Sequence, residues 1–194
     1  MEIDISWPID LSVEEAIKLQ LQLAKKVIMK DELPEKIKTI AGLDAAFTKD
    51  TYAIGACVVL DFNTLELLEK KTSKVKVKFP YVPSLLAFRE GEALLNVLKK
   101  IQTQPDIFMV DGQGISHQRR CGIASHIAVM LNAPCIGIAK SILVGKLKEE
   151  PKLVGQWVPL IDSNEVIGVG VLTKAKSKPV IVSIGHKISL ETAI

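Results

Sequence analysis

The sequence predicts a mixed α/β fold whose sheet has an antiparallel half and a parallel half. Three strand-like segments follow one another up to residue 79, and the two strand-like segments after them are each preceded by a helical pattern. Strands joined by short turns pair antiparallel, whereas strands joined through a helix pair in parallel. A length of 194 residues with 48% apolar residues is enough for one domain with a sizeable core.

The first predicted elements are a helix and a central strand. Ser12 and Glu15 have the spacing of a capping box, and apolar residues then recur at helical intervals over 12–29. Residues 39–47, TIAGLDAAF, have the small and β-branched residues of a crowded strand. Asp44 is the only charge in that strand.

Two further strands complete the predicted meander. Residues 52–60 are almost entirely apolar, and the alternation late in 65–79 points Lys74, Lys76 and Lys78 outward. Outward lysines on an outer strand are most often a solvated face or a protection against edge pairing. Contact with phosphate is the alternative interpretation.

A stiff loop and a helix come next. Residues 80–84, PYVPS, place two prolines around an aromatic residue, which predicts a protruding loop outside the sheet. Ser84 is expected to cap a helix that runs to about Lys100. On that helix Glu90 shares a face with apolar residues, so its carboxylate needs a partner.

The stretch PDIFMVDGQGISHQRRCGIASH, residues 105–126, is the predicted centre of the site. Residues 107–110 form a short buried strand that ends at Asp111, and Gly112 and Gly114 allow the backbone to approach a ligand closely. Positive charge and His117 follow. The stretch therefore indicates either an acid that holds a metal beside an anion-binding loop, or a helix-capping aspartate before a basic helix start.

The rest of the chain adds a helix, another buried strand and a hairpin. The helix ends before Pro134, and residues 135–139 form a strand with Lys140 at its carboxyl end. Beyond residue 145 the pattern weakens to an irregular strand, VGQWVPL, and a hairpin pair, VIGVGVLTK and PVIVSIGHK. Ser189 opens a final short helix.

This order of elements brings three acids together. A right-handed crossover through helix 84–100 lays strand 107–110 beside strand 40–47, so Asp44 and Asp111 become neighbours and Glu90 can reach the same point. Clustered carboxylates repel one another unless a cation neutralises them, and an all-oxygen set selects Mg²⁺ or Mn²⁺.

With phosphate as the partner, such a site predicts metal-assisted hydrolysis. Lys140 could balance phosphate charge or orient the attacking water. Taken alone, Lys140 is more simply an exposed lysine that closes a strand, and His117 is more simply a loop histidine.

The composition says more about where the protein is located than about what it binds. A net charge of +3 is too small to indicate nucleic-acid binding by itself. Cys57, Cys121 and Cys135 are scattered among apolar residues, as in a reduced cytosolic core. No apolar run is long enough for a membrane span and the N-terminus has no signal pattern, so a soluble cytoplasmic protein without a membrane partner is expected.

Five stretches of the chain together form a recognisable pattern: AGLDAAF at 41–47, PYVPSLLAFREGEALL at 80–95, DGQGISHQRRCGIASH at 111–126, IGIAKSIL at 136–143 and SIGHKISLETA at 183–193. With this pattern the chain resembles the endonuclease V family, nucleases that recognise deoxyinosine, a deaminated adenine, and cut on its 3′ side. The pairing of PYxPS…FRE with DGxGxxHxRR is highly specific, and the stretches cover most of the chain in the family's order. The resemblance implies a ribonuclease H-like fold over residues 1–194.

The resemblance also implies catalytic roles. Asp44, Glu90 and Asp111 match the family's metal-binding acids, which implies Mg²⁺ as cofactor with Mn²⁺ as a substitute. Lys140 matches a lysine near the scissile phosphate, and His117 falls on the family's loop histidine.

The implied substrate contacts are a wedge and a base pocket. Tyr81 would stack on bases or separate the strands, its alternative role being a surface aromatic that stiffens the loop. An extruded base would enter the pocket, because it cannot be examined fully within the stack. For Ile123, core packing is an equally good interpretation. The wedge residues are Pro80, Tyr81, Val82, Pro83 and Ser84, and the pocket residues are Gly112, Gly114, Ile123 and Leu143.

Two departures from the family pattern stand out. Gln118 replaces a common proline, which changes loop stiffness more than chemistry. The family also continues past Ile194 to a segment with an acidic residue or histidine near the metals, so we expect a domain that lacks this C-terminal segment. His186 is expected to be structural.

The expected function is that of a monomeric, Mg²⁺-dependent DNA repair endonuclease that hydrolyses a phosphodiester on the 3′ side of deoxyinosine. One alternative is a nuclease of the same fold that acts on inosine-containing RNA or on branched or flap DNA. Another is a lesion-binding module made inactive by the short C-terminus.

Overall fold

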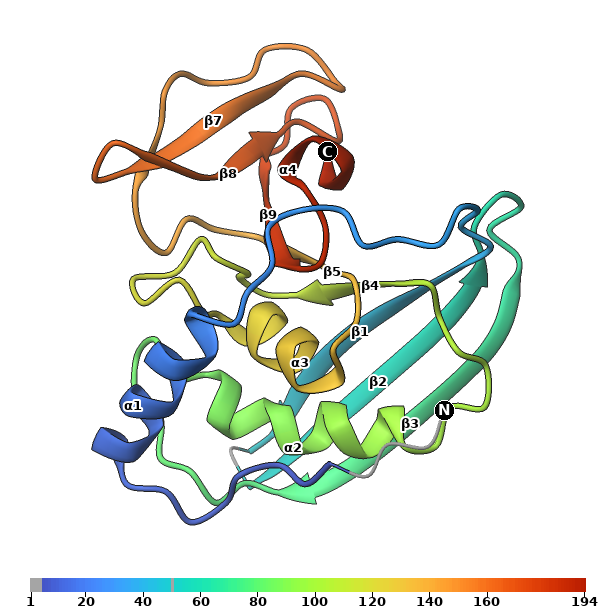
Figure 1. The fold of residues 1–194 in the computed structure, drawn as a ribbon, viewed down its shortest axis with the longest axis vertical. Helices are drawn as coiled ribbons and strands as arrows, with labels where there is room; N and C mark the ends of the chain where they lie inside the picture. Colours follow the sequence, from blue (N-terminus) through green and yellow to red (C-terminus); the bar gives the residue numbers. More distant parts are fainter. Residues whose placement is uncertain (1–4, 50) are drawn as a thin grey trace.

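A computed structural model describes residues 5–49 and 51–194 of the protein. Its centre is one nine-stranded sheet with the order β3-β2-β1-β4-β5-β9-β8-β7-β6 (Figure 1). The first three strands form the predicted antiparallel meander, and β4 and β5 run parallel to β1. These strands are β1 (Thr39–Thr48), β2 (Tyr52–Asp61), β3 (Leu67–Lys76), β4 (Ile107–Asp111) and β5 (Cys135–Ala139).

The second half of the sheet is antiparallel. Its last strand in sequence, β9, lies between β5 and β8 and pairs with both. The two-residue β6 was not predicted, because its segment reads as an exposed turn. The strands are β6 (Lys146–Leu147), β7 (Trp157–Asp162), β8 (Glu165–Val171) and β9 (Val180–His186).

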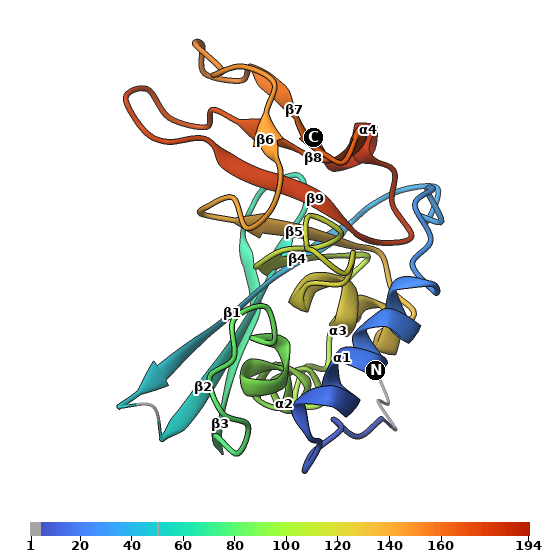
Figure 2. The ribbon, with the colours of Figure 1, turned by 90° about the vertical axis from the view of Figure 1, so that its left-hand side faces the viewer.

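Three helices cover one face of the meander and the parallel strands (Figure 2). Phe108 and Val110 of β4 point into the core beneath them. The short helix α4 and residues 27–37 pack around Ile107 and Ile136 on the other face. The helices are α1 (Val13–Ala24), α2 (Ala87–Leu98), α3 (Ile123–Leu131) and α4 (Leu190–Ala193), and none in the described part of the chain is long and apolar enough to cross a membrane.

The predicted crossover is confirmed, and it positions the acids. Ile40 to Leu43 of β1 lie in register with Ile107 to Val110 of β4, so the carboxyl ends of both strands meet at one edge. Helix α2 lies close against the meander, because Gly55 has no side chain and Ser73 donates a hydrogen bond to the Ala93 carbonyl at 2.6 Å.

The sequence patterns predict most helix ends correctly, and they are wrong at two of them. The capping box of Ser12 and Glu15 is present, and Ser189 caps α4 as predicted. Helix α1, however, ends at Ala24 rather than at residue 29. Ser84 does not cap α2: Leu86 is the N-cap residue, and Ser84 has a left-handed backbone with a φ of 69°.

Candidate active site

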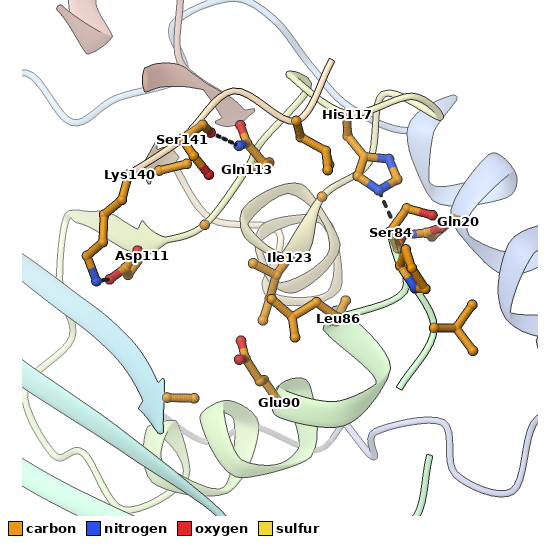
Figure 3. Close-up of a pocket in the computed structure, with 18 of the residues that line it drawn as sticks. Gln20, Ser84, Leu86, Glu90, Asp111, Gln113, His117, Ile123, Lys140 and Ser141 are labelled. Atoms are coloured by element: carbon orange, nitrogen blue, oxygen red, sulfur yellow. Dashed lines mark hydrogen bonds and ion pairs between the residues drawn. The ribbon is translucent and has the colours of Figure 1, made fainter. Parts of the chain in front are cut away.

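The three predicted acids line one cavity of about 510 Å³, although they come from different elements. Asp44 lies in β1, Asp111 ends β4, and Glu90 lies in the first turn of α2. Lys140, the residue after β5, lines the same cavity, as does His117 (Figure 3). The juxtaposition expected from the crossover is therefore present.

Glu90 has the most perturbed environment of these acids. Its side chain is largely buried, and burial raises its pKa to about 7, with the negative charges of Asp44 and Asp111 acting in the same direction. With such a pKa the carboxyl group is only partly charged at neutral pH, and a nearby cation would favour its fully charged form.

Two of the acids are turned toward their own partners. Asp111 accepts a hydrogen bond from Lys140 Nζ at 2.5 Å, an ion pair that raises the pKa of Lys140, and Asp44 accepts from the Ala45 N–H at 2.8 Å. Within residues 5–49 and 51–194, no three His, Cys, Asp or Glu side chains are gathered as a ready ligand set. The acids share a cavity, and their oxygen-only chemistry fits a hard divalent cation.

The glycine loop after β4 forms another wall of the cavity. Gly112 has a φ of 152°, and a Cβ added there would meet Ile123 at 2.3 Å. A Cβ at Gly114 would meet the Ile184 carbonyl oxygen at 2.1 Å. Ser183 Oγ accepts the Gly114 N–H at 2.9 Å, so β9 is the floor beneath this loop.

The predicted base-pocket residues have different surroundings. Gly112, Ile123 and Leu143 line the cavity, whereas Gly114 lies buried just behind it. Ile123 is only 4% exposed and belongs to the core, so the predicted core packing is confirmed, and its base-pocket role stays a prediction. Leu143 is 45% exposed at the rim.

The Pro-rich loop forms the opposite wall. Tyr81, Val82, Pro83 and Ser84 line the cavity, and Pro80 lies outside it. Tyr81 is 72% exposed, which fits both interpretations of this residue.

His117 lies in the wall of the cavity, but its side chain is almost fully enclosed. It is 2% exposed, its Nε2 lies 2.9 Å from the Ser84 carbonyl oxygen, and its Nδ1 accepts the Arg119 N–H at 3.1 Å. Burial lowers the pKa of His117 to about 4.

Sequence reasoning missed two polar residues of this site. Gln20 lines the cavity and is 1% exposed, and Gln113 Nε2 donates to the Ser141 carbonyl at 2.8 Å. A signal for Gln20 was available: it falls on the buried stripe of α1 between Ala16 and Leu23, where a polar residue needs a partner.

The chain is similar in sequence and in fold to known proteins. The sequence model described as Endonuclease V matches residues 21–194. A curated endonuclease V from Nostoc sp. is 48% identical over 189 residues, which are 97% of this chain and 85% of the relative. The crystal structure of endonuclease V from Bacillus subtilis has a TM-score of 0.91 at 31% identity and covers 100% of this chain and 85% of that one.

A solved complex is also similar. It contains Ciona intestinalis endonuclease V with a 24mer DNA that carries an inosine followed by a ribo-adenosine. Its TM-score is 0.79 at 35% identity, with 93% of this chain and 86% of that chain covered.

Proposed function

Because this chain belongs to the endonuclease V family of hydrolytic nucleases, we propose that it cleaves DNA at deoxyinosine, hydrolysing a phosphodiester on the 3′ side of the lesion with Mg²⁺. The observation that carries this proposal is the shared cavity. Its walls combine three acids with an exposed aromatic loop and a glycine loop. One cavity can therefore hold both an altered base and a reacting phosphodiester.

Asp44, Glu90 and Asp111 would hold the divalent metal that endonuclease V nucleases generally need. Held by these acids, such a metal would supply activation of water and charge stabilisation for the leaving oxygen. The raised pKa of Glu90 supports this assignment, because a cation is what would keep that carboxylate charged. Mg²⁺ is the proposed ion and Mn²⁺ the substitute, since both prefer oxygen ligands.

Lys140 would move from its pair with Asp111 toward the phosphate. Its side chain is 80% exposed, so this motion needs little rearrangement, and it would balance the charge of the scissile group. In the proposed complex Asp111 is then free to turn toward the cation.

The substrate would be held by opposite walls. Tyr81 would stack where the base leaves the duplex, and the altered base would enter between Gly112, Ile123 and Leu143. The similar Ciona intestinalis protein, crystallised on DNA that contains an inosine, supports this choice of partner.

The test is cleavage of a labelled duplex with a single deoxyinosine in the presence of Mg²⁺. Asp44→Asn and Asp111→Asn should each lower kcat/KM more than about a hundredfold, a loss of about 3 kcal/mol of transition-state stabilisation. Glu150→Gln, an exposed acid outside the cavity, is the matched control and should cleave like the parent.

Calorimetric titration with Mg²⁺ gives a readout besides activity, and both site variants should bind the ion more weakly. Unchanged cleavage in both variants would remove the metal assignment. Equal cleavage of undamaged DNA would remove the lesion specificity.

Inosine-containing RNA is a second candidate substrate. The nucleotide after the inosine in the Ciona intestinalis complex is a ribo-adenosine, so a similar protein accommodates a ribose at that position. Competition between strands that carry inosine in DNA and in RNA decides which one this protein prefers.

A further inference from the structure

Ser84 joins the Pro-rich loop to α2 in a conformation that only glycine adopts easily. Its φ of 69° places it in the left-handed region. A residue other than glycine is strained there and keeps this conformation only when its surroundings hold it. The contacts around Ser84 must therefore hold its backbone in this conformation.

Four side chains from two distant segments hold this residue. The Ser84 carbonyl oxygen lies 3.1 Å from Gln20 Nε2, 2.9 Å from His117 Nε2 and 3.1 Å from Arg119 Nη2. The Ser84 hydroxyl accepts from Arg119 Nη2 at 2.7 Å and from Gln118 Nε2 at 2.8 Å. We call Gln20, Ser84, His117, Gln118 and Arg119 the Ser84 clamp; three of its members are labelled in Figure 3.

The donors of the clamp are themselves fixed. Gln20 Oε1 accepts from Arg119 Nε at 2.7 Å, and Gln20 Nε2 also donates to the Cys121 carbonyl at 3.0 Å. Both ends of this buried amide are used, so its orientation is determined.

His117 is committed in the same way. Its Nδ1 accepts the Arg119 N–H, so the proton must sit on Nε2, which donates it to Ser84. Neither ring nitrogen is left to exchange a proton with a substrate. The histidine thus has the contacts of a structural donor.

We infer that the Ser84 clamp is a positioning device for lesion recognition, and that His117 serves this clamp rather than proton transfer. The inference rests on the proposed function. Residues 117–119 belong to the loop that begins with Gly112, and Ser84 lies three residues from Tyr81. The clamp therefore ties together the two walls between which an extruded purine base would lie.

Loosening the clamp should weaken recognition more than chemistry. A lost hydrogen bond of this kind is worth about 1–2 kcal/mol, which corresponds to roughly a tenfold change. KM for inosine-containing DNA should rise by that factor and the preference over undamaged DNA should fall, while kcat changes much less.

The first experiment compares His117→Gln with His117→Ala. A glutamine amide can place an N–H where Nε2 stands, but it cannot accept a proton as a base. His117→Gln should therefore recover most of the selectivity that His117→Ala loses and should keep the pH–rate profile of the parent. If both variants lose kcat equally, by the 10²–10⁴-fold typical of a missing general base, the inference is wrong.

The second experiment needs no substrate. Gln118 is exposed, so Gln118→Met should fold while it removes one donor to Ser84, and Gln104→Met is the matched control on the far side of the chain. Amide hydrogen exchange over residues 82–86 should be faster in Gln118→Met than in the parent and unchanged in Gln104→Met. Unchanged protection in Gln118→Met would overturn the clamp.

The two hypotheses fail separately. A parent protein that cuts no inosine-containing strand would contradict the proposed function, whereas the exchange measurement would still decide whether the clamp holds the loop.

Discussion

Several polar side chains of this protein are buried, and they differ in how the loss of contact with water is compensated. Glu90 is buried among other acids, and Gln20 and His117 are buried with every polar atom hydrogen-bonded. His126 on α3 is a different case. Neither of its ring nitrogens has a hydrogen-bond partner among residues 5–49 and 51–194, and its ring stacks on Trp7 with centroids 4.5 Å apart.

His126 should make stability depend on pH. Burial lowers its pKa from 6.5 to about 3, so between these values the unfolded chain binds a proton that the folded chain does not. The free energy of unfolding should therefore fall as pH falls through this window, by up to about 1.4 kcal/mol per pH unit from this group. Urea unfolding at several pH values between 7.5 and 5 measures this dependence. The free energy of unfolding should change less steeply with pH in His126→Phe than in the parent.

Phe88→Leu is the control for His126→Phe, because it alters the packing beside the same ring without removing a titratable group. Its free energy of unfolding should depend on pH as steeply as that of the parent. If His126→Phe also kept this pH dependence, His126 would not be held neutral in the folded protein.

At the scale of elements, the distance between α2 and the meander sets the place of Glu90. A Cβ at Gly55 would lie 2.6 Å from the Ala93 carbonyl oxygen, so β2 touches the helix backbone directly. Glu90 lies one turn earlier on the same helix. Whatever displaces α2 also displaces this acid.

Gly55→Ala should therefore lower both stability and activity. Overpacking of this kind costs about 1–3 kcal/mol, which should appear as a lower Tm together with slower cleavage. Gly42→Ala is the matched control in the neighbouring strand, where an added Cβ meets nothing within 4 Å. If Gly55→Ala kept the Tm of the parent, α2 would be able to move away from β2 without loss of stability.

At the scale of the whole molecule, the N-terminal segment binds the helix layer together. The Trp7 ring lies against Gly91 of α2, where an added Cβ would be 2.0 Å away, and it stacks on His126 of α3. Trp7 thus bridges two helices that both line the site.

Trp7→Ala should cost about 3–5 kcal/mol of unfolding free energy, as for other buried large side chains. Trp157→Ala provides the comparison, because Trp157 is 48% exposed in β7, whereas Trp7 is 6% exposed. Chemical denaturation of both variants measures the difference. Equal losses would show that Trp7 does not hold the layer.

Much of this architecture was predictable because it follows from local patterns and one chirality rule. The strands around Asp44 and Asp111 have clear apolar patterns, and the right-handed crossover then places them side by side. The protruding PYVPS loop and the glycine loop were predicted from their prolines and glycines, whereas their roles toward a substrate come from the resemblance to a family and stay predictions.

What could not be predicted depends on contacts between distant segments. Ser84 looked like a helix cap, but side chains of residues 20 and 117–119 hold it in another conformation. The pairing of β9 with β8 was predicted as a hairpin, but its pairing with β5, which places β9 between the two, is not visible in its own sequence.

That place of β9 has a consequence for synthesis of the protein. The acids and the aromatic loop are encoded early, but the Gly114 and Ile115 amides hydrogen-bond to Ser183 and Ile184, near the end of the chain. A ribosome-bound chain that stops before residue 180 has no support under its glycine loop. The nascent polypeptide therefore cannot complete this wall of the cavity until β9 has emerged and paired into the sheet.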